Sequence, residues 1–188
     1  KKMASSIEHI TKYYADRDLS GEEIKNLIGK PPVLYSDLSK YTFKTFFPAE
    51  SPYQIVLLQT KAVNFGHFVA VFLTSDAIYY QDSYGLGAPD TYKSYTEFDE
   101  EYPPLLKNLL ATDPQRRPVI SNNVDYQKFG KAQTCGRWAA LRILFRNLTN
   151  PQFESIFRGN HGFLSRPDYV ATILTLNGLN NVEEYFQK

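Results

Sequence analysis

Residues 67–82 read HFVAVFLTSDAIYYQD, two apolar runs joined by a short polar turn. Each run has the length and composition of a β-strand. Ser75 and Asp76 suit a tight turn, so the segment predicts an antiparallel hairpin. The start of the first strand then lies beside the end of the second, and we expect His67 and Asp82 to be near neighbours.

The elements around this hairpin predict an α+β fold. Strands are expected at 54–60, 67–74, 77–82 and 119–126, and helices at 4–15, 20–29, 104–112, 135–148 and 167–177. Strands and helices do not alternate as in a βαβ protein, so we expect a central mixed or antiparallel sheet surrounded by helices. The chain is interpreted as one domain, 1–188, with helical segments at about 4–30 and 149–188 on either side of a core at about 33–148.

Local signals bound two of the helices. Ser20 and Glu23 form a capping-box pattern at the start of the second helix, and Pro31-Pro32 is expected to stop it. Residues 33–53 are interpreted as an irregular, aromatic connection. Ser165 is expected to cap the last helix, with Pro167 in its first turn, and a short tail helix is expected beyond Gly178.

Composition excludes several classes of protein. The 21 Lys and Arg residues nearly balance 20 Asp and Glu residues, so nothing in the charge indicates nucleic-acid binding, although a local basic patch stays possible. The lone cysteine excludes an intrachain disulfide and a cysteine-based zinc site. We expect no metal and no cofactor. No run of apolar residues is long enough to span a membrane, and the N-terminus lacks a secretory signal pattern.

That cysteine, Cys135, stands before Gly136 and a strongly apolar helical pattern. Trp138 and Leu141 belong to a wide stripe that predicts a helix buried along most of its girth. The N-terminus of a helix carries partial positive charge and N–H donors, which favour a thiolate. The sequence therefore predicts a nucleophile at the N-terminus of a buried helix.

A nucleophilic thiol requires a base, and His67 is the best placed of the three histidines. His9 is expected on the surface of the first helix, and His161 in a loop. A carboxylate at Asp82 would orient the imidazole and stabilise its charged form. His67 as a buried structural histidine, and Asp82 as a simple turn residue, are the alternatives.

The oxyanion formed by thiol attack needs hydrogen-bond donors. The backbone N–H of Cys135 is one candidate, and a side-chain amide is the usual second. Both Gln127 and Gln133 precede the thiol and could reach it, so the choice between them stays open.

The order His67, Asp82, Gln127, Cys135-Gly136 resembles the adenovirus-protease and ubiquitin-like-protease clan of cysteine peptidases. The resemblance covers residues 33–148 and is nearest to maturation proteases of virophages, polinton-like elements and large DNA viruses. It implies that His67 is the general base, Asp82 its orienting acid, Cys135 the nucleophile and Gln127 the oxyanion donor. One departure is Phe68, where the family usually has tryptophan.

The resemblance implies a ubiquitin-like-protease fold and a thiol endopeptidase that cleaves viral capsid precursors at small, Gly-containing sites during particle maturation. Substrates would be polypeptides held in a narrow aromatic tunnel, for which Phe68 and Trp138 are candidate walls, with a place in the plain core equally expected for Trp138. It also implies a location in the virion and in the viral factory of the host cytoplasm. Oligomeric state is not readable from the sequence.

Two other functions compete with this one. The first is a protease that removes ubiquitin-like modifiers, of the SUMO type, from host proteins. The second is a catalytically silent binding module with the same fold. Intact His67, Asp82 and Cys135 favour catalysis over the silent module.

Overall fold

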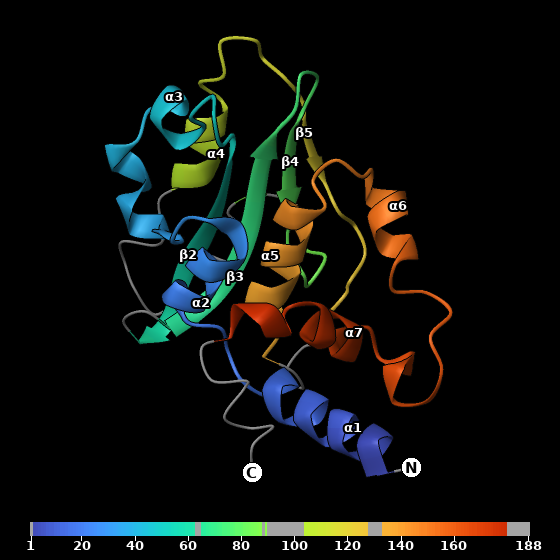
Figure 1. Ribbon diagram of the computed structural model, residues 1–188. Helices are drawn as coiled ribbons and strands as arrows, with labels where there is room; N and C mark the ends of the chain where they lie inside the picture. Colours follow the sequence, from blue (N-terminus) through green and yellow to red (C-terminus); the bar gives the residue numbers. More distant parts are fainter. Residues whose placement is uncertain (1, 63–64, 88, 90–103, 128–132, 180–188) are drawn as a thin grey trace.

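The computed structural model describes residues 2–62, 65–87, 89, 104–127 and 133–179 (Figure 1). Within these residues one mixed sheet has five strands in the order β1-β2-β3-β4-β5. They are β1 (Val33–Leu34), β2 (Tyr53–Ala62), β3 (Phe65–Leu73), β4 (Ile78–Gln81) and β5 (Val119–Ser121). The three central strands are antiparallel, whereas β1 and β5 pair in parallel with β2 and β4. The predicted α+β class and the hairpin of residues 67–82 are confirmed.

Helices surround the sheet, as predicted. The α-helices are α1 (Lys2–Ala15), α2 (Gly21–Ile28), α3 (Phe43–Phe46), α4 (Leu105–Leu110), α5 (Cys135–Leu144), α6 (Asn150–Ser155) and α7 (Pro167–Leu174), and the 3-10 turns include η1 (Tyr35–Lys40), η4 (Gly162–Ser165) and η5 (Leu176–Gly178). In Figure 1, α5 crosses the sheet beside β3, with α2 on one side of it and α6 on the other.

Side chains of β2 and β3 contribute alternately to two apolar cores, one on each face of the sheet, because successive residues of a strand point to opposite faces. Ile55, Leu57, Phe68, Ala70 and Phe72 pack against α2 and α5. The residues between them, Val56, Leu58, Val69 and Val71, pack against η1, α3 and α4. The sheet is thus covered on both faces, and α5 is held against β3 along its length.

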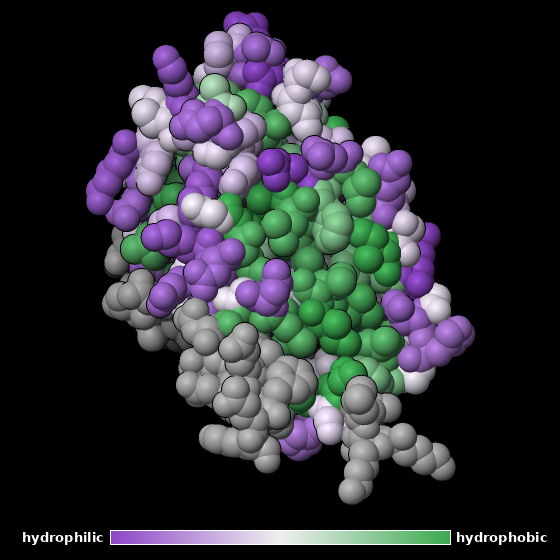
Figure 2. Space-filling model, in the orientation of Figure 1, coloured by the Kyte–Doolittle hydropathy of each residue, from purple (hydrophilic) through white to green (hydrophobic). Residues whose placement is uncertain are grey.

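A third apolar cluster joins the C-terminal helices to α5. Its buried members are Tyr126, Trp138, Leu141, Phe153, Phe157 and Ala171. Figure 2 shows apolar side chains gathered on the face where α5, α6 and α7 lie, and Leu144 and Leu174 are 44% and 40% exposed. The predicted helical packing of the C-terminal segment is therefore present, although the expected tail helix lies outside the described residues.

Several predicted boundaries need correction. Helix α2 carries the predicted capping box at Ser20, but Gly29 ends it in a left-handed conformation with φ of 86°, before the two prolines. The connection 33–53 is more regular than expected, because β1, η1 and α3 lie in it. Its short elements lack the periodicity that sequence patterns need, and β1 is only two residues long.

The last predicted strand and the two C-terminal helices are shorter than expected. Strand β5 stops at Ser121, because the next residue, Asn122, bonds the segment after β4 through its side chain. That side chain binds the backbone of Asp82 in place of a backbone-to-backbone sheet bond. Helix α5 stops at Leu144, and the Arg142 guanidinium binds the carbonyls that follow it. Ser165 is wrong as a cap, since it lies in η4 and α7 begins at Pro167 without a side-chain cap.

Candidate active site

His67 lies on β3 directly after a glycine that the sheet requires. A Cβ at Gly66 would overlap the backbone carbonyl of Leu58 on β2, so only glycine fits there. His67 is opposite Leu58 in the β2–β3 register and is 5% exposed. The histidine is therefore presented by a rigid central strand.

The predicted pairing of His67 with Asp82 is present. Nε2 of His67 lies 2.9 Å from Oδ1 of Asp82, and the Asp82 side chain is fully buried. The last β3–β4 pair is Ala70 with Gln81, so Asp82 is the first residue after the ladder. Its carboxylate reaches the imidazole beyond the end of β4.

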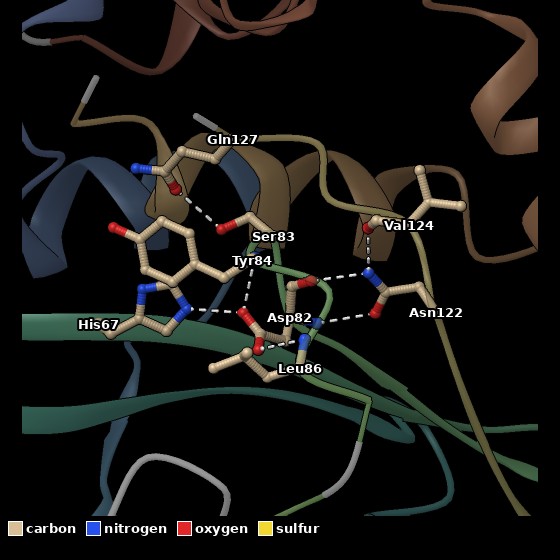
Figure 3. A network of polar contacts seen from close by, with 8 residues as sticks. All are labelled: His67, Asp82, Ser83, Tyr84, Leu86, Asn122, Val124 and Gln127. Atoms are coloured by element: carbon tan, nitrogen blue, oxygen red, sulfur yellow. Dashed lines mark hydrogen bonds and ion pairs between the residues drawn. The ribbon is translucent and has the colours of Figure 1, made fainter. Parts of the chain in front are cut away.

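The Asp82 carboxylate is bound on several sides (Figure 3). Oδ1 also accepts a hydrogen bond from the Tyr84 backbone at 2.9 Å, and Oδ2 accepts one from the Leu86 backbone at 3.3 Å. The Asn122 side chain bonds both the N–H and the carbonyl of Asp82, at 2.9 and 2.6 Å. These bonds fix the carboxylate in one orientation, and sequence patterns gave no sign of the role of Asn122.

Cys135 is the first residue of α5, as predicted, and is 4% exposed. Its side chain lies close enough to the imidazole of His67 to raise the pKa of that ring. Nε2 of His67 binds Asp82, which leaves Nδ1 available to the sulfur. Burial lowers the pKa of His67, but the hydrogen bonds and charges of Asp82 and Cys135 outweigh it and raise that pKa to about 9.

The two candidate glutamines have different positions. Gln127 is 1% exposed, and its Oε1 accepts a hydrogen bond of 2.8 Å from Ser83 Oγ. Figure 3 shows its amide nitrogen pointing away from Ser83, toward the same side as Nδ1 of His67 and the Tyr84 hydroxyl. Gln133 is exposed, and its backbone N–H binds the carbonyl of Ala15. The geometry favours Gln127 over Gln133 as the candidate oxyanion donor.

Tyr84 stacks on the catalytic candidate His67. The two rings are 4.6 Å apart between centroids and 16° from parallel. Burial, with the negative charges of Cys135 and Asp82 next, raises the pKa of Tyr84 to about 12, so the phenol stays neutral at physiological pH. The sequence analysis did not single out this tyrosine, because nothing in its spacing indicates a stacking partner.

The C-terminal segment also holds the start of α5. Asp168, which is buried in the first turn of α7, accepts a 2.6 Å bond from Thr134 Oγ1 and a 3.0 Å bond from Trp138 Nε1. Thr134 immediately precedes Cys135. Asp168 thus positions the turn that presents the thiol, a function that a single sequence does not signal.

Arg137 connects the first turn of α5 to both terminal segments of the described chain. Its fully buried guanidinium donates to the carbonyl of Tyr14, on α1, and to the hydroxyl of Thr175, after α7, each at 3.0 Å. No carboxylate hydrogen-bonds it among the described residues, and burial lowers the pKa of Arg137 to about 10. The two helical terminal segments therefore support the site from one side.

A cavity of about 280 Å³ adjoins this support. It is lined by Tyr14, Arg17, Asp18, Ser20, Glu23, Arg137 and Leu179. Burial raises the pKa of Asp18, while the positive charges of Arg137 and His67 oppose that rise. The candidate catalytic residues do not line this cavity, but its wall includes Arg137, two residues after Cys135.

Phe68 and Trp138, the candidate tunnel walls, are both buried in the apolar core, which for Trp138 was the equally expected alternative. Phe68 is 6% exposed and contacts the position of Gly136, while Trp138 is fully buried among Tyr126, Phe153 and other aromatic rings. Phe68 follows His67 on a strand and so faces the opposite side of the sheet. Phe68 nevertheless packs in the same apolar cluster as Cys135, and Tyr84 stacks on His67.

A virophage protein is similar to this chain over most of its length. Uncharacterized protein V9 of the Sputnik virophage is 31% identical over 176 residues, covering 88% of this chain and 98% of the virophage protein. The chain belongs to the V9 family. No family model matches the sequence. Kinship with V9 supports a viral origin, which the sequence analysis anticipated.

The other two histidines stand apart from the site. His9 and His161 are both exposed, as expected.

In the described part of the chain, no group of three or more His, Cys, Asp or Glu residues could hold a metal ion. None of the described helices is long and apolar enough to cross a membrane. The chemistry available at the site is that of a thiol beside an oriented imidazole.

Proposed function

We propose that this chain is a cysteine endopeptidase. The observation that carries the proposal is the buried line Asp82–His67–Cys135, in which one ring nitrogen binds the carboxylate and the other is available to the thiol. Nucleophile, base and orienting group in hydrogen-bonding contact are the signature of covalent acyl-transfer catalysis. The thiol's position at the start of α5 supports the same interpretation.

In the proposed mechanism, the Cys135 sulfur attacks the scissile carbonyl while Nδ1 of His67 holds the thiol proton. The tetrahedral oxyanion accepts hydrogen bonds from Gln127 Nε2 and the Cys135 backbone N–H. It collapses to a thioester as His67 gives the proton to the leaving amine. Water, deprotonated by His67, then hydrolyses the thioester and regenerates the thiol. Asp82 stabilises the imidazolium at each stage.

The proposed substrates are structural precursor proteins of a virus, cut at small-residue sites during particle maturation. The resemblance in the order of His67, Asp82, Gln127 and Cys135 supports this substrate class, and so does kinship with a virophage protein. The proposed places of action are the virion and the viral factory in the host cytoplasm.

The test is cleavage of capsid precursors encoded by the same genome, purified and mixed with this protein. Mass spectrometry of the products identifies the cut bonds. We expect defined cuts beside glycine, none with Cys135→Ala, and labelling of Cys135 by a peptide aldehyde or vinyl sulfone. Ubiquitin-like and SUMO-type conjugates form the parallel substrate series.

Each result has a definite meaning. Cleavage of conjugates without cleavage of precursors would replace the proposed substrate class and keep the chemistry. No cleavage of either set, together with no labelling of Cys135 by the probe, would overturn the peptidase assignment in favour of a silent binding module. The Cys135→Ala protein is the control for contaminating proteases in every arm.

A further inference from the structure

We infer that Tyr84 is a positioning residue for the imidazole of His67: its ring stacks on the imidazole, keeps the ring plane in line between Asp82 and Cys135, and stabilises its protonated form. The inference rests on the proposed function for its effect on catalysis, but not for its effect on His67 itself.

The first observation is the way Tyr84 is attached. Its ring lies 4.6 Å from the imidazole and nearly parallel to it. Its backbone N–H donates to Asp82 Oδ1, the same oxygen that faces Nε2 of His67. Oδ1 of Asp82 therefore binds both the His67 ring and the backbone of Tyr84. The turn after β4 places the tyrosine ring on the imidazole.

The turn that carries Tyr84 is itself fixed in place. Gly85, next to Tyr84, has φ of 67°, and a Cβ there would come within 2.9 Å of the backbone of Val124 and Asp125. The chain of residues 82–85 is thus held against the segment that follows β5. A ring mounted on such a turn has little freedom to leave the imidazole.

The charged groups around the pair show why stacking matters. His67 faces Asp82 from the end of β4 and Cys135 from α5, and its charge also acts on Asp18 from the α1–α2 connection. Only the edge of the imidazole makes these polar contacts. An aromatic face over the ring attracts its positive form without competing for a nitrogen.

This arrangement has a consequence for the reaction. The imidazolium forms when Cys135 loses its proton, so a ring that stabilises imidazolium favours the reactive state of the pair. A tilted imidazole would lose alignment with either the sulfur or the carboxylate. Loss of the stack is therefore expected to lower kcat more than it raises KM.

The test measures the titration of the His67 ring by NMR in four proteins. Tyr84→Phe keeps an aromatic face and is expected to keep the midpoint of the unaltered chain. Tyr84→Leu keeps apolar cover without a π-face, and we expect the midpoint to fall by about half a unit to one unit. Tyr79→Leu is the matched control, because Tyr79 stacks on Phe72 elsewhere on the sheet. It should leave the midpoint unchanged.

Equal midpoints in Tyr84→Phe and Tyr84→Leu would overturn the inference, as would a rise in Tyr84→Leu. If Tyr84→Leu does not fold, Tyr84→Trp replaces it, since indole has the strongest face for a cation and should hold or raise the midpoint; a fall would overturn the inference. The titration needs no substrate. Absence of peptide cleavage would therefore count against the proposed function alone.

Discussion

The Ser83 hydroxyl donates a 2.8 Å hydrogen bond to the side-chain oxygen of Gln127, and both side chains are almost completely buried. The Ser83 carbonyl also accepts the backbone N–H groups of Tyr126 and Gln127. One serine thus positions the glutamine backbone and decides which end of its amide is turned away. The end that is turned away is the N–H₂ donor that an oxyanion requires.

Replacing Gln127 tests this orientation directly. Gln127→Ala is expected to lower kcat by roughly a hundredfold, because one oxyanion donor is lost. Gln133→Ala is the matched control: its side chain is exposed, and we expect kcat to stay within about twofold, as for most surface changes. Steady-state kinetics on one peptide substrate compares them.

A reversed order of the two glutamine variants would assign the oxyanion donor to Gln133 instead. Ser83→Ala provides an intermediate case. It keeps the donor but removes the bond that orients it, so its kcat should lie between those of the unaltered chain and Gln127→Ala. A Ser83→Ala protein with full activity would show that the orientation is set elsewhere.

Removal of the nucleophile separates catalysis from folding. Cys135→Ala is expected to reduce turnover by roughly four orders of magnitude or more. The side chain is small and sits at the first position of α5, so the far-ultraviolet circular dichroism spectrum should not change. Residual turnover above one per cent in a freshly purified sample would contradict the assignment.

Changing the carboxylate tests the orienting role of Asp82. Asp82→Asn keeps the volume but removes the charge that stabilises the imidazolium, and we expect kcat to fall by about 10² to 10⁴. The His67 titration midpoint should fall as well, since Asp82 is a principal cause of its raised pKa. NMR and kinetics on the same sample check both effects, and an unchanged midpoint would refute the pairing in solution.

The raised pKa of His67 makes a prediction about stability. The folded chain holds the His67 proton up to pH about 9, whereas the ordinary value is 6.5. Between these values the folded state binds more protons than the unfolded state, so the free energy of unfolding falls as pH rises. The stabilisation is complete below pH 6.5 and lost above about 9.

Urea unfolding at several pH values measures this slope, with His67→Asn as the reference. Lys30 acts in the opposite direction, because burial lowers its pKa to about 8 and deprotonation then favours the folded state. The difference between the two proteins cancels the Lys30 contribution. A difference that is constant from pH 6.5 to 9 would rule out a raised pKa at His67.

Gly66 carries a prediction about geometry. Gly66→Ala would press a methyl group into the Leu58 carbonyl, and this contact is with backbone that cannot rotate away. We expect a loss of stability of about 1–3 kcal/mol and a loss of activity, because His67 is the next residue. Gly21→Ala, at a glycine without a positive φ whose Cβ position meets only Pro32 at an ordinary 3.5 Å, controls for the loss of glycine freedom alone. Chemical denaturation of both proteins gives the comparison.

The hairpin and the helix after Cys135 were predictable, because apolar periodicity and strand length carry that information locally. The pairing of His67 with Asp82 followed from antiparallel geometry alone. The parallel pairing of β1 and β5 was not predictable, since these strands are short and their partners lie elsewhere in the chain. Strand β5 shows the difficulty: two of its three residues are exposed and give no pattern.

Residues that hold the site were harder to predict than residues that form it. Asn122 and Asp168 have no sequence neighbours that reveal their partners, and their bonds to Asp82 and Thr134 arise only once distant segments pack. Buried polar residues need partners, but a sequence does not say which. For Trp138 the sequence left a tunnel wall and a core position equally open, and the structure places the residue in the core.

The bond between Asp168 and Thr134 has a consequence for the timing of activity. Ribosomes make the thiol, its base and its acid before they make α7, so a nascent chain carries all three reactive groups without the carboxylate that holds the turn before Cys135. Full competence then waits for the synthesis and docking of α7. If the chain has the proposed peptidase activity, such an order would protect neighbouring nascent proteins from an incompletely synthesised enzyme.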